Sequence, residues 1–204
     1  MKLNELTQTT AQLLDRLLAV MEAEIVPLTK QEVARGNKIF GAAILRKADL
    51  STVIAGSNNE TANPLWHGEV HTIKLKYDDP AARAVPPGDC LFLSTHEPCT
   101  MCLSAIAWGG YDNFFYLFSH EDSRDAFAIP HDLRILQELF RLPPGGYARE
   151  NAFFSGYSIR DLVDACPPAE QAAFRARIAA IVDAYDALSA AYQASKGEND
   201  IPLN

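Results

Sequence analysis

The chain has 204 residues, of which 48% are hydrophobic and 22% charged, so it suits one globular domain with a buried core. Charged residues interrupt every apolar run, which excludes a membrane span and predicts a soluble, cytoplasmic protein with no membrane partner. The net charge of −8 weighs against a partner bound mainly through phosphate groups.

The first third of the chain predicts a helix, a hairpin and a second helix. Apolar residues recur at three- and four-residue steps through 3–25, as on one face of an amphipathic helix. The apolar runs at 39–45 and 52–56, separated by a turn-like segment, predict a β-hairpin. Asn63 and Pro64 are a favoured cap and first-turn residue, so they predict the start of a helix that carries WHGEVHTIKLKY.

The middle of the chain alternates helices and strands. CLFLST (90–95) and NFFYLFS (113–119) are continuous apolar runs, which is typical of strands covered on both faces. Between them, Pro98 predicts the start of a helix that Gly109 ends. The order helix, strand, helix, strand over 64–119 implies parallel pairing and a layered α/β domain.

The remainder predicts a helix at 131–140, an edge strand at 153–159 and a long amphipathic helix. We expect a single domain over 1–204, with its core at about 30–160. An additional helical segment at about 165–197 would serve packing or dimerisation, because its apolar stripe must be buried against something.

Two short motifs contain the residue types that bind metals or transfer protons. WHGEVH contains His67 and, two residues later, a glutamate; alone this is weak, since roughly 0.1–1 His-x-Glu triplets are expected by chance. HEPCTMC places Cys99 and Cys102 on one face of a helix start, where the helix dipole favours thiolates, and fewer than about 0.01 Pro-Cys-x-x-Cys motifs are expected. Two thiolates and one imidazole are three zinc ligands, which leaves the fourth tetrahedral position for water.

A closed structural zinc site is the alternative. It needs a fourth ligand, for which the candidates are Cys90, His71, His96 and Cys166. The glutamate of WHGEVH has no use in such a site, which favours the open one. We expect His71 to support a ligand or pack against the sheet, His96 to line the pocket or lie at the surface, and Cys90 to lie in the core.

The pattern His-x-Glu followed by Pro-Cys-x-x-Cys is the signature of zinc deaminases, and the chain resembles the cytidine deaminase-like superfamily from about 39 to 120. THEPCTMCLSAIAW and FFYLFSHEDSRDAF look most like bacterial guanine deaminases and tRNA adenosine deaminases, and LWHGEV is similar to fungal cytosine deaminases. The resemblance implies a three-layer α-β-α fold with a mixed, mostly parallel sheet and extra terminal helices. It also implies bound Zn²⁺.

In this reading the metal ligands are His67, Cys99 and Cys102, and Glu69 is the catalytic acid–base. Two thiolates offset most of the zinc charge, so a general base is needed beside the bound water. Glu69 would take the proton of that water and return it to the ring nitrogen and the leaving ammonia. Residues two apart point to different faces of a regular helix, so His67 and Glu69 can converge only in a first turn.

Four further residues are expected to contact the substrate: Asn58, Trp66, Trp108 and Asp132. In related enzymes an Asn after the second strand holds the substrate, and Asn58 has that place, with Asn59 as the alternative. The two tryptophans would stack on a flat ring, although core packing is as good an expectation for Trp108. Bacterial guanine deaminases carry an acidic pair where this chain has AIPHD, so Asp132, or else His131, is the nearest substitute.

The sequence therefore predicts a hydrolase acting on cyclic amidines. It would convert an exocyclic amine of a small heterocycle, such as the free nucleobase guanine or cytosine, to a carbonyl with release of ammonia. The alternatives are a tRNA adenosine deaminase and a non-catalytic, zinc-stabilised interaction protein. We expect a homodimer that takes a small-molecule substrate and no nucleic acid.

Overall fold

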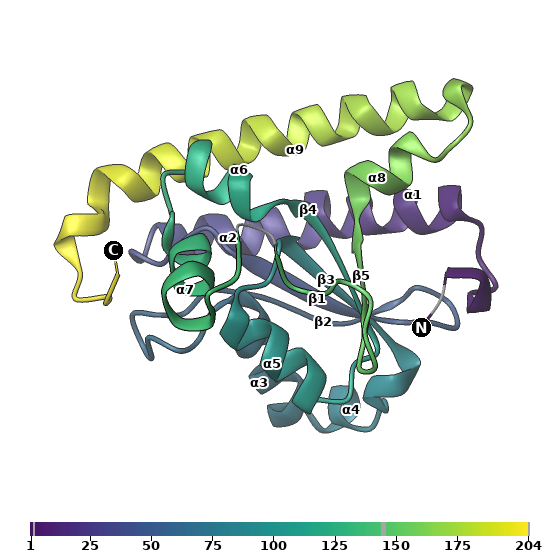
Figure 1. The fold of residues 1–204 in the computed structure, drawn as a ribbon, viewed down its shortest axis with the longest axis horizontal. Coiled ribbons are helices and arrows are strands. Elements are labelled where there is room, and N and C mark those ends of the chain that lie inside the picture. The colour runs from purple at the N-terminus through teal and green to yellow at the C-terminus, as the bar shows by residue number, and fades with distance from the viewer. Residues whose placement is uncertain (2, 144–145, 204) are drawn as a thin grey trace.

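The computed structural model describes residues 1, 3–143 and 146–203, which form a five-stranded sheet between layers of helices (Figure 1). The sheet order is β2-β1-β3-β4-β5. The strands are β1 (Gly41–Arg46), β2 (Thr52–Ser57), β3 (Cys90–His96), β4 (Asn113–Phe118) and β5 (Ser155–Ser158). Strand β1 runs antiparallel to its neighbours β2 and β3, whereas β3, β4 and β5 are parallel to one another. The mixed α/β sheet predicted from the sequence is confirmed.

Helices cover both faces of the sheet (Figure 1). One layer contains α1 (Thr10–Val20), the π-helical turn η2 (Met21–Ile25), α2 (Val26–Val33), α8 (Ile159–Asp164) and α9 (Pro168–Ser195). The other contains α3 (Gly68–Asp78), α4 (Pro80–Arg83) and α5 (Thr100–Trp108). The remaining elements are η1 (Leu3–Glu5), η3 (Pro87–Asp89), α6 (His120–Asp125), α7 (His131–Phe140) and η4 (Lys196–Glu198).

Alternation along the strands builds two apolar cores, because successive side chains point to opposite faces of a sheet. The core under α1, α2 and α9 takes Ala43, Leu45, Leu91, Leu93, Phe115 and Leu117 from the strands. The core under α3 and α5 takes Ala42, Ile44, Phe92, Phe114 and Tyr116. Both faces are therefore buried, as the continuous apolar runs of β3 and β4 predict.

The first helical region is displaced from the predicted range of 3–25. It begins after Thr9, whose hydroxyl accepts from the backbone N–H of Gln12 while the Gln12 side chain accepts from that of Thr9. This reciprocal capping box fixes the start of α1. Pro27 has no N–H to donate, and a π-helical turn directly before it lets the helical path continue to Val33.

The long helix α9 covers the core. The apolar side chains that it buries are Phe174, Ile178, Ile181, Tyr185, Leu188 and Tyr192. The ring of Tyr185 lies against those of Phe118 and Phe127, 5.0 and 6.4 Å away between centroids. Burial within the same chain therefore accounts for the apolar stripe, and the expected homodimer stays a prediction. No helix in the described part of the chain, α9 included, is long and apolar enough to cross a membrane.

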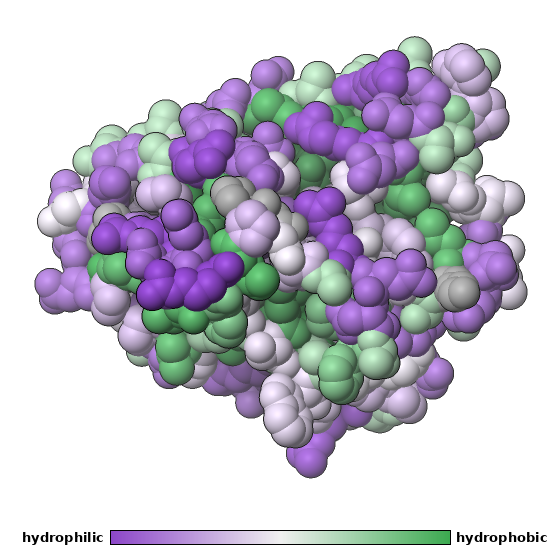
Figure 2. All heavy atoms as spheres, viewed as in Figure 1, coloured by the Kyte–Doolittle hydropathy of each residue, from purple (hydrophilic) through white to green (hydrophobic). Residues whose placement is uncertain are grey.

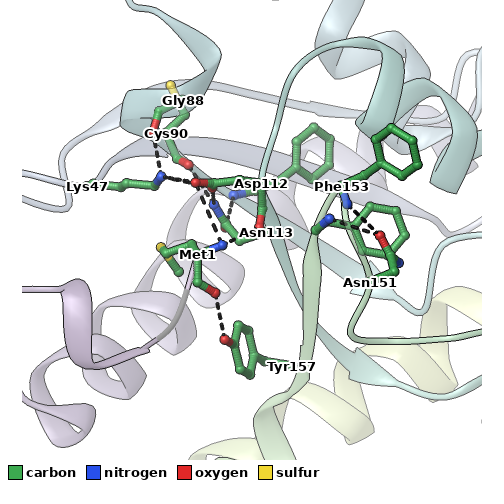
Figure 3. A network of polar contacts seen from close by, with 11 residues as sticks. Met1, Lys47, Gly88, Cys90, Asp112, Asn113, Asn151, Phe153 and Tyr157 are labelled. Carbon is green, nitrogen blue, oxygen red and sulfur yellow. Dashed lines mark hydrogen bonds and ion pairs between the residues drawn. The ribbon is translucent and has the colours of Figure 1, made fainter.

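A polar network ties the amino-terminal ends of β3 and β4 to the first residue (Figure 3). The Asp112 carboxylate accepts from Lys47 Nζ at 2.8 Å, and its backbone carbonyl accepts from the Met1 amino group at 3.0 Å. The Asn113 side chain bridges the backbones of Cys90 and Phe92 on β3. This end of the sheet is fixed by charge pairing, and the predicted metal ligands lie at the opposite end, after β2 and β3.

Candidate active site

His67 lies outside the helix that the sequence predicts it to occupy. The side chain of Asn63 accepts from the backbone N–H of Leu65, and its carbonyl accepts from that of Trp66, so this segment forms a turn. Helix α3 begins at Gly68, and the predicted start at Asn63–Pro64 is wrong. His67 is the N-cap, with extended backbone angles of φ −59° and ψ 160°. Its imidazole therefore does not follow the side-chain directions of a regular helix, and it can lie close to a side chain of the first turn of α3.

Gly68 allows this helix start to approach the sheet closely. A Cβ atom at this position would lie 2.8 Å from the carbonyl oxygen of Phe40 and 2.9 Å from the backbone nitrogen of Gly41. Any larger residue would push α3 away from β1. The glycine between His67 and Glu69 is therefore part of what sets the position of both.

Three soft or borderline donors converge at the starts of α3 and α5. Cys99 is the N-cap of α5 and Cys102 lies in its first turn. The Sγ atom of Cys99 is 3.5 Å from Nδ1 of His67, and the ligand atoms of all three residues lie within 4.8 Å of one another. A tetrahedral zinc site with Zn–S of about 2.3 Å and Zn–N of about 2.0 Å has ligand–ligand distances of about 3.5–3.8 Å. The donor set fits zinc.

The donor cluster attracts a cation. Hydrogen bonding from Cys102 and the contact with His67 hold the pKa of the Cys99 thiol well below its ordinary value. Burial alone would lower the pKa of His67, but the Cys99 thiolate, with Glu60 and Glu69 nearby, raises it to about 9. Burial and the neighbouring Cys99 thiolate raise the pKa of Cys102. A second thiolate in this cluster therefore requires a positive charge between the ligands.

Glu69 lies beside the donors but is not one of them. Its carboxyl group is buried, and Oε1 accepts from the Ser94 hydroxyl of β3 at 2.8 Å. Burial, followed by the charge of Cys99, raises the pKa of this carboxyl group. A buried carboxyl group with a raised pKa takes up a proton more readily than an exposed one, which suits an acid–base group.

A cavity of about 340 Å³ opens beside these residues. Its polar lining residues include Lys38, Glu60, His67, Cys99, His131 and Asp132. Asp132 and His131 begin α7, so the structure places both candidates for the missing acidic pair at this cavity. Burial and the Cys99 charge raise the pKa of Asp132 well above its ordinary value. At the rim, Leu65 and Leu203 are each 58% exposed.

Asn58 is buried at the end of β2, with its side-chain nitrogen 2.5 Å from Oε2 of Glu60. Its Oδ1 atom is buried and has no hydrogen-bond partner among the described residues. Neither tryptophan lines the cavity. The ring of Trp66 stacks on that of His71, with centroids 5.5 Å apart. Trp108 is 92% exposed at the far end of α5, so the structure supports neither expectation for it, ring stacking or core packing.

The four candidates for a closed site lie elsewhere. His71 shares a hydrogen bond with the Ser57 carbonyl, and Cys90 and Cys166 donate to backbone carbonyls. His96 is buried beneath α9, where desolvation lowers its pKa to about 3, so the expectation that it lines the pocket or the surface is wrong. Among the described residues the metal-binding group therefore contains three protein ligands.

Surface hydropathy around the site is mixed. Figure 2 shows apolar atoms exposed between hydrophilic patches on the face that carries α5 and α7. The large exposed apolar side chains of the described residues are Leu65, Tyr77, Trp108, Leu139, Phe140, Phe153 and Leu203. Only Leu65 and Leu203 of this set border the cavity, so the cavity entrance combines an apolar rim with a charged interior.

Sequence reasoning missed Lys38 and Glu60. Their Nζ and Oε1 atoms are 2.9 Å apart, and the same oxygen is 3.6 Å from Nε2 of His67. The one available signal was the acidic residue that closes GSNNE, two residues after the predicted substrate-binding Asn58. No signal marked Leu203, which reaches the cavity only because the chain folds back after α9.

Removal of both cysteine ligands should abolish metal binding. A Cys99→Ser, Cys102→Ser variant is expected to lose most of the single zinc ion that we expect per chain, because hydroxyls replace the thiolates that neutralise it. Metal analysis after dialysis measures the loss, and thermal unfolding measures the accompanying loss of stability. A Cys90→Ser, Cys166→Ser variant, with two buried cysteines changed elsewhere, is the control. Full zinc retention in the first variant would place the ligands elsewhere.

Comparison with known proteins agrees with this geometry. Residues 17–118, half of the 204 residues, match the family described as "Cytidine and deoxycytidylate deaminase zinc-binding region". Guanine deaminase of Bacillus subtilis (strain 168) is 35% identical over 89 residues, which cover 43% of this chain and 54% of that protein. The chain thus spans about half the length of this curated relative.

A solved structure shares the fold of this chain. Guanine deaminase from Nitrosomonas europaea superposes with a TM-score of 0.50 at 19% identity, covering 79% of this chain and 84% of that one. The structure of guanine deaminase from Bacillus subtilis gives a TM-score of 0.47 at 28% identity, covering 74% and 87%. Together with the match over half of its length, the paired motifs show that this chain belongs to the family with the cytidine and deoxycytidylate deaminase zinc-binding region, within the cytidine deaminase-like superfamily.

Proposed function

We propose that the protein is a zinc-dependent hydrolytic deaminase of a small heterocycle, with a free nucleobase such as guanine or cytosine as the first choice. The observation that carries this proposal is the buried Glu69 carboxyl group beside an open set of three zinc donors, of which His67 and Cys99 line the cavity. A purely structural zinc site would use four protein ligands and would need no such group. Bound zinc would lower the pKa of a water molecule so that it attacks at neutral pH.

The residues of the chain supply the proton transfers. Glu69 takes a proton from the attacking water and passes it to the ring nitrogen next to the carbon under attack. Glu69 then takes the remaining proton from the added hydroxyl group and delivers it to the exocyclic nitrogen, so that the C–N bond breaks, ammonia leaves and the carbonyl forms. Ser94 holds the Glu69 carboxyl group in place through its hydroxyl, 2.8 Å away. The raised pKa of Glu69 suits this role, because a carboxyl group with a raised pKa holds the transferred proton more readily than an ordinary one.

The polar groups that line the cavity, together with Asn58, which contacts the lining residue Glu60, suit a ring with several nitrogen atoms. The Oδ1 atom of Asn58 is a buried acceptor with no protein partner among the described residues, and an N–H group of a substrate would satisfy it. Asp132, with its raised pKa, offers a carboxyl group that can donate as well as accept. The similarity to a guanine deaminase further supports a nucleobase, although AIPHD departs from the acidic pair of that branch.

The size and charge of the site favour a free base over tRNA. A cavity of about 340 Å³ lies at the low end of the range of about 300–1,000 Å³ for small-molecule sites. The chain has 18 basic and 26 acidic residues, and α6, just past the second motif, carries Glu121, Asp122 and Asp125. These carboxylates would repel a phosphate backbone, and the apolar rim at Leu65 and Leu203 offers it no positive charge.

Ammonia release tests the proposal and its alternatives together. Zinc-loaded protein is assayed against purines, pyrimidines, pterins and amino-triazines, and in parallel for inosine formation in tRNA at low salt. We expect ammonia from at least one free base and no inosine. Inosine formation without activity on any free base would support a tRNA adenosine deaminase instead. Stoichiometric zinc with no turnover of any compound or tRNA would support the non-catalytic alternative.

A further inference from the structure

Glu60 is a buried carboxylate on which three donor groups converge. It lies in the connection between β2 and α3, and its side chain is 1% exposed. Its Oε1 atom is 2.9 Å from Lys38 Nζ and 3.6 Å from Nε2 of His67, and Oε2 accepts from the side-chain nitrogen of Asn58 at 2.5 Å. Both residues of the ion pair line the cavity. One carboxylate thus contacts a metal ligand, a substrate-binding candidate and a buried lysine.

A gain in stability does not account well for the buried ion pair between Lys38 and Glu60. Transfer of two charges out of water costs several kcal/mol per ion, and a buried ion pair often contributes less to stability than apolar side chains of the same volume. The Lys38 side chain is only 6% exposed, so little solvent offsets this cost. A carboxylate in such a place is better explained by the groups that it orients.

The contact with His67 matches a common feature of metal sites. Nδ1 of His67 faces the thiolates, which leaves Nε2 to carry the proton. A histidine ligand usually donates this second N–H to a carboxylate or carbonyl, which fixes the tautomer and the orientation of the ring. Among the described residues, Glu60 is the carboxylate that lies within ion-pair distance of Nε2 of His67.

The contact with Asn58 fixes the direction of the amide. An ionised carboxylate only accepts hydrogen bonds, so the amide nitrogen of Asn58 must face Glu60. The other end of the amide, Oδ1, is then the atom left without a partner. The same carboxylate therefore decides that Asn58 offers a ligand an acceptor rather than a donor.

We propose that Glu60 is a positioning residue that orients the metal ligand His67 and the amide of Asn58 together, while Lys38 neutralises its charge. This inference rests on the proposed function, since it takes His67 to be a zinc ligand and Asn58 to face the substrate. It adds that one carboxylate, that of Glu60, sets both the orientation of the metal ligand His67 and the choice of an acceptor rather than a donor that Asn58 offers to the substrate.

The test compares two substitutions that affect the two halves of the ion pair. Glu60→Gln leaves one acceptor oxygen for three donors, so we expect zinc affinity to fall about 10–100-fold, the usual effect of removing such a partner. Lys38→Met leaves the carboxylate facing His67, and its uncompensated charge favours a bound cation. We expect zinc affinity in this variant to equal or exceed that of the unchanged protein. Competition with a chromophoric chelator measures both, and the visible spectrum of the cobalt-substituted protein reports ligand geometry.

A merely structural ion pair would predict that both substitutions weaken zinc binding alike, and that outcome would overturn the inference. An affinity for Glu60→Gln within about threefold of the unchanged protein would also overturn it. Glu24→Gln, which removes a half-buried ion pair with Arg16 away from the site, is the control. If Glu60→Gln does not fold, the Lys38→Met, Glu60→Gln double variant removes the anchor without leaving an unpaired charge. Absence of zinc binding by the unchanged protein would instead contradict the proposed function itself.

Discussion

Replacement of Glu69 by glutamine is expected to leave zinc bound and to slow deamination by about 10²–10⁴-fold, the usual effect of removing a positioned acid–base. Glutamine keeps the shape of the side chain and can still accept from Ser94, but it cannot take up a proton. Because Glu69 is not among the metal-binding donors, the substitution should not release the metal. Metal analysis and the rate of ammonia release from the best substrate measure the two effects on one preparation.

Glu24→Gln, far from the cavity, is the matched control for the loss of one carboxylate and should keep the full rate. Turnover by Glu69→Gln within about threefold of the unchanged protein would rule out the proposed proton transfers. Loss of zinc from this variant would instead mean that Glu69 contributes to the metal site.

Truncation after Pro168 should prevent stable folding. The segment removed carries the six apolar side chains that α9 buries in the core. At about 1.5–3 kcal/mol for each buried side chain, their loss amounts to roughly 9–18 kcal/mol. This equals the whole free energy of unfolding of a typical protein, about 5–15 kcal/mol, so we expect aggregation. Soluble yield, gel filtration and far-ultraviolet circular dichroism measure the effect.

A pair of single substitutions separates the loss of packing from the mere shortening of the chain. Ile181→Asp places a charge on the buried face of α9, whereas Ala187→Asp places the same charge on its exposed face. Only the first should lower the thermal stability sharply, because an unpaired buried carboxylate is costly. A soluble truncated protein with an unchanged helix signal would show that the core does not need α9.

Local patterns predicted most elements because they agree with the tertiary structure. The helix at 131–140 is observed over the predicted range, and the apolar runs at 90–95 and 113–119 form β3 and β4. The start of α3 differs because a non-local contact competes with the local signal. The backbone N–H of Asn59 donates to the Trp66 carbonyl, which closes the loop between them and turns Asn63 into a turn residue instead of a helix cap.

The same distinction applies to the site. His67, Cys99 and Cys102 could be identified as candidate ligands because their motifs place each of them at or near a helix start, independently of the rest of the fold. Lys38 and Glu60 were not, since their pairing joins two loops that only the hairpin brings together. The length of the predicted helix alone argues against Trp108 as a substrate-binding residue. A helix rises about 1.5 Å per residue, which puts it at the far end of α5 from the cysteines.

The two tryptophans give this protein two separable fluorescence signals. Trp66 precedes the candidate metal ligand His67 and stacks on the imidazole ring of His71, so its emission depends on the position of these neighbours. Trp108 is almost fully in water, so its emission reports solvent and added quenchers. A soluble quencher such as iodide therefore silences Trp108 first, and the remaining signal follows events at the donor cluster without any attached dye.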